Sequence, residues 1–172
     1  MKILGIETSC DETSVAIVED GKKVLSNIIS SQIDIHRLTN GVVPEVAARA
    51  HVSKLEPVLD EALKQAETSF ADIDAIAVTV RPGLINSLVC GTTFGQVLSF
   101  IYDKPLIPVN HIKGHILSCW LERQSEIELP IVVLTASGGH NELVLVRNEH
   151  EFEVLGETLD DAAGEAYDKA AK

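Results

Sequence analysis

Aromatic residues are scarce in this 172-residue chain, at 4% of its composition, and cysteines are few. With so few aromatic residues, the core has to be built mostly from Val, Ile, Leu and Ala. An apolar content of 45% is ordinary for a packed domain. The three cysteines, Cys10, Cys90 and Cys119, are widely spaced. This spacing excludes a disulfide framework and a C-x-x-C metal pair, and it is typical of reduced, buried thiols.

Basic residues are also few, with 14 Lys and Arg against 26 Asp and Glu and a net charge of −12. Phosphate contacts require Lys and Arg, so this balance excludes a protein that binds nucleic acid over its whole surface. A local basic patch or a basic partner is compatible with it. No apolar run approaches the roughly 20 residues that span a bilayer, and the first residues lack the apolar region of a signal peptide. We therefore expect a cytoplasmic protein without a membrane segment.

Hydrophobic periodicity predicts strands that alternate with helices, which is typical of an α/β fold. The helix that begins at Pro44 contains Pro57, which should kink or split it near Ser53 because proline lacks the N–H donor. Strands are predicted at 3–8, 15–18, 24–29, 73–80, 106–109, 131–136, 142–146 and 152–157, and helices at 44–66, 84–102, 111–121 and 159–172.

The chain contains an internal repeat. A shift of 128 positions aligns residues 8–12 with residues 136–140, and residues 15–18 with residues 143–146. Each copy is a buried strand, a tight polar turn and a second strand, as two lobes that hold a phosphate between their turns would need. The last helix reaches Lys172 without a cap or a stop signal. We therefore expect a truncated protein with a first lobe at 1–110, a connecting helix at 111–129 and the start of a second lobe at 130–172.

Two histidines, His111 and His115, lie four positions apart directly after an apolar run. On a helix they share one face, which is a common start of a metal site. Two ligands do not close such a site, and this spacing also arises by chance.

Two polar turns follow predicted strands. In residues 7–14, Asp11 and Glu12 could orient a substrate, a water molecule or an ion, although an ordinary hairpin loop explains the stretch equally well. In residues 137–140, Gly138 and Gly139 would let the backbone approach a phosphate or an adenylate, unless the stretch is a plain Gly-Gly hairpin. His140 is not counted as a metal ligand.

Two further groups of charged residues have simpler alternatives. Asp161, Glu165 and Asp168 are at helical spacing on one face and could accept hydrogen bonds from a nucleotide or sugar, or could only complement the helix dipole. Glu45, Arg49 and His51 indicate no more than a surface ion pair.

Together these stretches resemble one family, the glycoprotease-type tRNA adenosine threonylcarbamoyltransferases. The resemblance covers the whole chain, and it implies the two-lobed, actin-like and sugar-kinase-like ATPase fold, whose lobes are ribonuclease H-like. The matching motifs are residues 5–13, residues 41–45, the pair His111 and His115, residues 137–140 and residues 160–166.

The resemblance also implies an activity. The enzyme would move a threonylcarbamoyl group from threonylcarbamoyl-AMP to N6 of the adenosine beside the anticodon, in tRNAs that read codons beginning with A. His111 and His115 would bind one divalent metal, Fe(II) or alternatively Zn, together with an aspartate beyond Lys172. This chain alone would then be inactive. The adenylate would lie against Thr135, Ala136, Ser137, Gly138, Gly139 and Asp168. As a hypothesis, Asp11 or Glu12 takes the proton of the exocyclic amine.

Partners follow from the same resemblance: tRNA, a paralogous actin-like subunit and a small ATPase subunit, or a second copy bound through helices 44–66 and 84–102. The acidic protein would need basic partner subunits or a local patch from Arg49, Lys54 and Lys113 to bind tRNA. Competing interpretations are a noncatalytic paralogue that serves as a scaffold and an ATP-dependent phosphotransferase of the same superfold. A metalloprotease is disfavoured because no H-E-x-x-H helix is present.

Three positions depart from the family pattern. The stretch Arg81-Pro82-Gly83 stands where the family often has Gly-Pro-Gly. Asn40 stands where the family often has glycine, and Gln96 stands where it often has a basic residue. We expect altered loop geometry at the first two positions, and no basic contact to a partner or tRNA at the third.

Overall fold

The computed structural model describes residues 1–37, 41–123, 125–148 and 150–171, apart from the side chain of Asp168. Asn40 therefore lies outside the described residues. The chain divides into two compact units, Met1–Gly114 and His115–Lys172, and the division falls within helix α4 (His111–Leu117).

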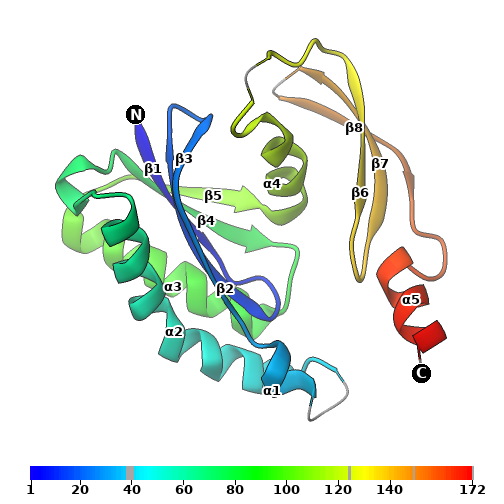
Figure 1. Ribbon diagram of the computed structural model, residues 1–172, viewed down its shortest axis with the longest axis horizontal. Coiled ribbons are helices and arrows are strands. Elements are labelled where there is room, and N and C mark those ends of the chain that lie inside the picture. Colours follow the sequence, from blue (N-terminus) through cyan, green and yellow to red (C-terminus); the bar gives the residue numbers. More distant parts are fainter. Residues whose placement is uncertain (38–40, 124, 149, 172) are drawn as a thin grey trace. The chain divides into compact units, whose positions relative to one another are not determined.

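A five-stranded mixed sheet forms the centre of the first unit (Figure 1). Its order is β3-β2-β1-β4-β5, with β1 antiparallel to β2 and parallel to β4, which is parallel to β5. The carboxyl ends of β1, β4 and β5 therefore lie along the same edge of the sheet. The strands are β1 (Lys2–Glu7), β2 (Glu12–Glu19), β3 (Lys23–Ser31), β4 (Ala75–Arg81) and β5 (Leu106–Asn110).

Helices α2 (Pro44–Gln65) and α3 (Ile85–Tyr102) pack side by side on one face of this sheet (Figure 1). The buried core between them is aliphatic, as the scarcity of aromatic residues predicts: its fully buried members include Leu4, Ile17 and Ile76. Small residues bring α3 close to the sheet, because a Cβ at Gly95 would lie 3.5 Å from the Cβ of Val78.

Of the kink or split predicted near Ser53, the split is wrong, because α2 runs from Pro44 to Gln65 without interruption. Pro57 and Ser53 are both exposed, so water can satisfy the Ser53 carbonyl that loses its helical donor. On the opposite face Leu55, Val58 and Leu59 are buried in the core. This packing keeps the helix continuous through the proline.

Some short elements were not predicted. Helix α1 (Ile33–Arg37) follows β3, and a 3-10 turn (Phe70–Asp72) precedes β4. Helix α4 ends at Leu117, earlier than the predicted 121, and continues as a 3-10 turn (Ser118–Trp120). Among the described residues, no helix has both the length and the apolar content needed to cross a membrane.

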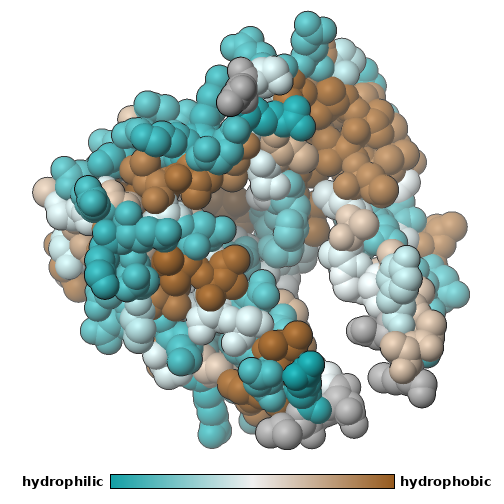
Figure 2. Space-filling view, in the orientation of Figure 1, coloured by the Kyte–Doolittle hydropathy of each residue, from teal (hydrophilic) through white to brown (hydrophobic). Residues whose placement is uncertain are grey.

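The second unit contains an antiparallel meander of three strands, β6 (Ile131–Ala136), β7 (Asn141–Asn148) and β8 (Glu151–Glu157). The strands β1, β2 and β3 form the same meander in the first unit, which confirms the repeat. Apolar side chains remain exposed over β6–β8 (Figure 2). Among them, Leu134 is 67% exposed and Val154 is 55% exposed.

The last helix, α5 (Ala163–Ala171), begins four residues later than predicted. The backbone N–H groups of Gly164 and Glu165 donate to the carbonyls of Ser137 and Gly138 at 3.2 and 3.1 Å. These bonds fix the start of α5 against the turn after β6. Asp160 and Asp161 therefore precede the helix and are not part of its first turn.

Replacement of Gly91 by alanine should lower the free energy of unfolding by about 1–3 kcal/mol. A Cβ at this position would collide with Oγ1 of Thr8, which is 1% exposed and donates to the Ser87 carbonyl at 2.8 Å. Urea unfolding of the variant measures the loss.

Gly114→Ala in α4 is the matched control, because a Cβ there meets nothing within 4 Å. It should keep stability or raise it by about 0.5–1 kcal/mol through helix propensity. Equal stabilities of the two variants would contradict the close packing of α3 on Thr8.

Candidate functional site

Polar side chains meet at the edge where β1, β4 and β5 end. Glu7 is the last residue of β1, Thr79 lies near the end of β4, and His111 directly follows β5 as the first residue of α4. Oε2 of Glu7 accepts a hydrogen bond from Oγ1 of Thr79 at 2.6 Å and lies 3.1 Å from Nδ1 of His111. Three segments that are distant in the sequence are thereby joined through one carboxylate.

The turn after β1 adds two more contacts to this cluster. The backbone N–H of Ser9 donates to Oε1 of Glu7 at 2.5 Å, and Oγ of Ser9 lies 3.2 Å from Nδ1 of His111. Burial raises the pKa of the Glu7 carboxyl, but the hydrogen bonds from His111, Ser9 and Thr79 outweigh it and bring the pKa from 4.5 down to about 2. Glu7 is therefore a carboxylate at every physiological pH.

A charged Glu7 determines which nitrogen of His111 carries the proton. A carboxylate can only accept, so Nδ1 of His111 holds the hydrogen and Nε2 holds the lone pair. Histidines that bind metals almost always donate their other ring N–H to such a carboxylate or to a carbonyl. The donor set around His111 therefore fits a metal ligand that coordinates through Nε2.

His115 is one turn further along α4, on the same face as His111. The structure thus places the predicted pair on one helix, with the i and i+4 spacing intact. Within the described residues, no group of three His, Cys, Asp or Glu side chains is arranged to hold a metal ion.

Asp11 and Glu12 lie on the far side of the same turn. The prediction of buried thiols is wrong for Cys10 and Cys119, which are exposed. The carboxyl of Asp11 is beside the Cys10 thiol, whose pKa is raised from 9.0 to about 11, first by partial desolvation and then by the hydrogen bond to Asp11. Cys10 is therefore a protonated thiol and a poor nucleophile. Glu12 is exposed and opens β2 opposite Ser31. The catalytic role of Asp11 and Glu12 stays a prediction.

The interpretation of His51 as part of a surface ion pair is wrong, because this side chain is 0% exposed. Its Nδ1 lies 2.8 Å from Oγ1 of Thr13, and its Nε2 lies 3.0 Å from the carbonyl of Cys10. Burial lowers the pKa of His51 below 6.5, so at neutral pH it donates from Nε2 to Cys10 and accepts from Thr13. His51 thus ties the turn after β1 to α2.

The glycine turn of the second unit closes through its own hydrogen bonds. The N–H of Ser137 donates to the carbonyl of His140 at 3.0 Å, and the N–H of His140 donates to Oγ of Ser137 at 3.0 Å. At Thr135, Oγ1 donates to the carbonyl of Glu142 at 3.3 Å. A Cβ at Gly138 or Gly139 would meet nothing within 4 Å, so the space is open in that direction, while Gly164 packs against another side of the Gly138 backbone.

The prediction that Asp161 shares a helical face with Glu165 and Asp168 is wrong for Asp161, which precedes α5. Asp161 instead forms an ion pair with Lys169, and Glu165 lies 3.1 Å from the same ammonium. These exposed pairs complement the ends of a short helix. The side chain of Asp168 lies outside the described residues.

Sequence reasoning did not assign a role to Glu7, although it recognised the turn that follows. The available signal was a glutamate at the end of an otherwise apolar strand, because a charge there needs several donors nearby. Which donors those are depends on the parallel pairing of β1 with β4, which is not local in sequence.

Comparisons with known proteins were made for the whole chain. A family model described as TsaD, tRNA N6-adenosine threonylcarbamoyltransferase, matches residues 23–172. A protein of that name from Thermomicrobium roseum is 56% identical over 177 residues, which cover 100% of this chain and 48% of the relative. One from Staphylococcus saprophyticus is 55% identical, with 99% and 49% covered. The chain therefore spans about half the length of the curated relatives it matches.

A solved structure is also similar, that of YeaZ from Pseudomonas aeruginosa. It matches with a TM-score of 0.54 at 20% identity, over 91% of this chain and 66% of that protein. At this identity the likeness concerns the fold alone. It confirms the actin-like, sugar-kinase-like α/β fold that the sequence predicts.

Removal of the Glu7 charge should destabilise the chain in a pH-dependent way. The folded pKa lies below the unfolded value, so the carboxylate stabilises the fold fully above pH 4.5, and this contribution is lost as the pH falls toward about 2. Because the side chain is 34% exposed, we expect Glu7→Gln to cost on the order of 1–2 kcal/mol at pH 7, after a discount for solvent screening. Thermal unfolding from pH 7 to pH 3 measures the difference.

Glu61→Gln serves as the control, since Glu61 forms an exposed pair with Lys64 at 3.5 Å. Its effect should stay below about 0.5 kcal/mol at every pH. A Glu7→Gln variant that matches wild type at pH 7, or whose deficit persists undiminished at pH 3, would rule out the stabilising charge.

Proposed function

The chain belongs to the tRNA N6-adenosine threonylcarbamoyltransferase family, and from this premise we propose that it is the metal-binding part of such a transferase. The whole protein would transfer the threonylcarbamoyl group of threonylcarbamoyl-AMP to N6 of the adenosine beside the anticodon, in tRNAs that read codons beginning with A. Since the chain spans about half of its relatives, the activity we propose is that of the full-length protein that contains it.

The observation that carries the proposal is the contact between Glu7 and His111. A structural histidine needs no charged partner, whereas this imidazole meets a carboxylate whose pKa is about 2. The carboxylate keeps the proton on Nδ1, so Nε2 is the nitrogen that would coordinate a metal. His111 is thereby prepared to bind a cation, and His115 provides a second imidazole on the same helix face.

We propose that His111 and His115 hold one divalent ion, Fe(II) or alternatively Zn. When bound, the ion would supply Lewis-acid polarisation of the carbamoyl oxygen. Two imidazoles suit either metal, so the ligands alone do not choose between them.

The remaining chemistry consists of orienting the two substrates and removing one proton from the N6 amine. The mixed anhydride of the donor is already activated, so orientation of the two substrates supplies much of the rate. The N6 amine forms a bond to the carbamoyl carbon, the bond from that carbon to the phosphate oxygen breaks, and AMP leaves. The amine loses a proton in this step. Asp11 or Glu12, as carboxylates on the turn after β1, would accept it.

The second unit would hold the adenylate. We assign this contact to Thr135, Ala136, Ser137, Gly138, Gly139 and Asp168. The Cβ directions of the two glycines are open. Polar turns of this kind accept phosphates through backbone N–H groups.

A second actin-like subunit, paralogous or identical, would bind the outer face of α2 and α3. This face exposes apolar side chains that the core does not use: Val52 is 68% exposed, Val89 54% and Phe100 88%. Exposed apolar side chains on adjacent helices are typical of a protein interface. A small ATPase subunit is the further partner we expect.

Metal content tests the assignment of His111 directly. The full-length protein should contain one divalent metal per chain, and His111→Ala should lose it and at least 100-fold of the transfer rate, because a ligand is removed. Glu7→Gln should lower the affinity for the metal about 10- to 100-fold, since it removes the carboxylate that orients His111. Elemental analysis and a chelator competition measure both.

His140→Ala is the control for this experiment. His140 makes a turn hydrogen bond in the second unit and is not assigned to the metal, so the variant should keep its full content. Wild-type metal stoichiometry in His111→Ala would exclude the proposed site.

The role of the two carboxylates is tested separately, in the full-length protein. Of Asp11→Asn and Glu12→Gln, the variant that removes the base should transfer about 10²- to 10⁴-fold more slowly, with its metal content unchanged. Single-turnover transfer to an unmodified tRNA transcript gives the rate. If both variants transferred at the wild-type rate, neither residue would be the base.

A further inference from the structure

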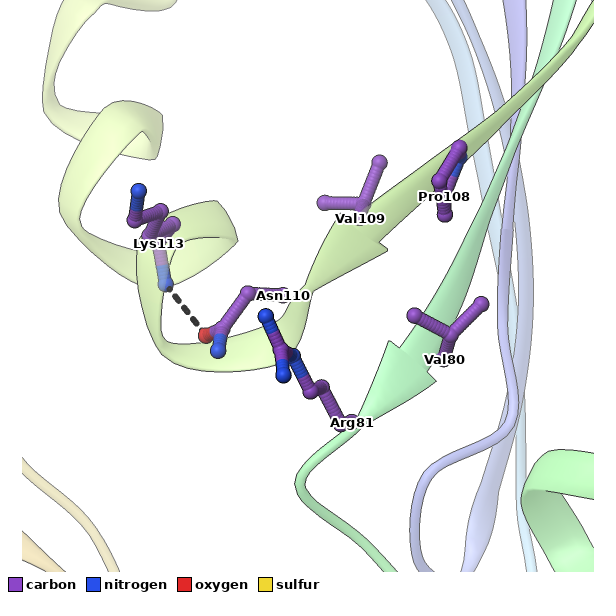
Figure 3. Close-up of a pocket in the computed structure, with 6 residues that line it drawn as sticks. All are labelled: Val80, Arg81, Pro108, Val109, Asn110 and Lys113. Atoms are coloured by element: carbon purple, nitrogen blue, oxygen red, sulfur yellow. Dashed lines mark hydrogen bonds between the residues drawn. The ribbon is translucent and has the colours of Figure 1, made fainter. Parts of the chain in front are cut away.

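A pocket of about 400 Å³ lies where β4 and β5 end, and it is built wholly from the first unit (Figure 3). It lies beside the Glu7–His111 contact without sharing a residue with it. Its lining consists of apolar walls and polar or basic rims, namely Val80, Arg81, Pro108, Val109, Asn110 and Lys113. No carboxylate lines it, although acidic residues outnumber basic ones by 26 to 14 in the sequence.

A bulge in β4 places Arg81 at this pocket. Thr79 pairs with Val109, but Arg81 pairs with Asn110, so Val80 is the additional residue. A bulge redirects the side chains that follow it. Figure 3 shows the Arg81 guanidinium alongside the side chain of Asn110. Within the described part of the chain, the guanidinium makes no ion pair.

The orientation of Asn110 is determined by its hydrogen bonds. Its Oδ1 accepts from the backbone N–H groups of Ile112 at 2.9 Å and Lys113 at 3.2 Å. The side-chain oxygen is therefore used within α4, and Nδ2 is the part that can donate to a ligand. With Arg81 and Lys113, the polar rim offers N–H donors and positive charge.

The loop after Arg81 is held rigidly against the turn that contacts His111. A Cβ at Gly83 would lie 2.6 Å from the carbonyl oxygen of Ser9, and its φ of +156° also favours glycine. The N–H of Leu84 donates to that same Ser9 carbonyl at 2.7 Å. The position of Arg81 is thus coupled to that of Ser9, whose Oγ contacts His111.

We propose that this pocket binds a backbone phosphate of the tRNA, close to the adenosine that is modified; the inference rests on the function proposed above. A guanidinium binds phosphate through two parallel N–H donors, and an ammonium adds a point charge. Such contacts position a nucleic acid without reading its sequence. The residues assigned to the adenylate belong to the second unit, whereas this pocket is built from the first, and the RNA is the other substrate that carries phosphate.

The experiment uses the full-length protein with the partner subunits that its activity requires. The affinity for an unmodified tRNA transcript is measured against salt concentration, for wild type and for Arg81→Ala. Loss of one phosphate contact should weaken binding on the order of tenfold at physiological salt and reduce the slope of log K against log salt by about 0.7–1. Arg81→Lys should restore most of the slope.

Lys22→Ala is the matched control. It also removes one positive charge, but Lys22 lies in the turn between β2 and β3, at the opposite end of the sheet from Arg81. Its salt slope should equal that of wild type. The affinity for threonylcarbamoyl-AMP, measured in parallel, should be the same in all four proteins.

Equal tRNA affinities and slopes for Arg81→Ala and Lys22→Ala would overturn the assignment, while normal transfer by the wild type would leave the proposed function intact. A loss of adenylate affinity in Arg81→Ala, with tRNA binding unchanged, would assign the pocket to the adenylate phosphate and also overturn it. If the wild type neither bound nor modified tRNA, both the pocket and the proposed function would be rejected.

Discussion

A negative charge at the end of a buried strand is the constraint on which the rest of the site depends. Glu7 ends β1, in which Leu4 and Ile6 are buried, and its carboxylate lies where solvent reaches it only in part. A partly buried carboxylate is tolerated only with several donors. Ser9, Thr79 and His111 provide them from three different segments. Satisfaction of one charge therefore fixes the turn after β1, the end of β4 and the start of α4 together.

The turn that carries Ser9 and Asp11 is also held by both helices of the first unit. From α2, His51 contacts Thr13 and the carbonyl of Cys10. From the loop before α3, Leu84 donates to the carbonyl of Ser9. The same helices expose the apolar face that we assign to a second subunit. The functional turn and that face are consequently parts of one packed body, and rigidity at the turn depends on how α2 and α3 are placed.

Sequence patterns predicted most of the fold because its signals are local. Alternating apolar residues and Pro44 at a helix start each act within a few residues. The repeat at a shift of 128 positions showed the start of the β meander in two copies. The split predicted at Pro57 failed for a physical reason. The cost of this proline depends on whether the unpaired carbonyl faces water, and the structure shows that both residues concerned are exposed.

The site was less predictable, because its contacts join segments about a hundred residues apart. The spacing of His111 and His115 is visible in the sequence, but the partner that sets the tautomer of His111 is not. The burial of His51 was signalled by its spacing, because Ala47 and Leu55, four residues before and after it, share its helical face and are buried. Asp161 was wrongly predicted to continue a helical face. The hydrogen bond from Gly164 to Ser137, which sets the start of α5, also joins segments that are distant in the sequence.

If the full-length protein acts on tRNA as we propose, charge distribution decides where this acidic chain can contact it. With a net charge of −12, the average surface repels phosphate, and only places where carboxylates are absent can attract it. The pocket at the ends of β4 and β5 is such a place, because its walls are apolar and its rim carries Arg81 and Lys113. On the proposed function, the rest of the affinity for tRNA would come from the part of the full-length protein outside this chain or from partner subunits.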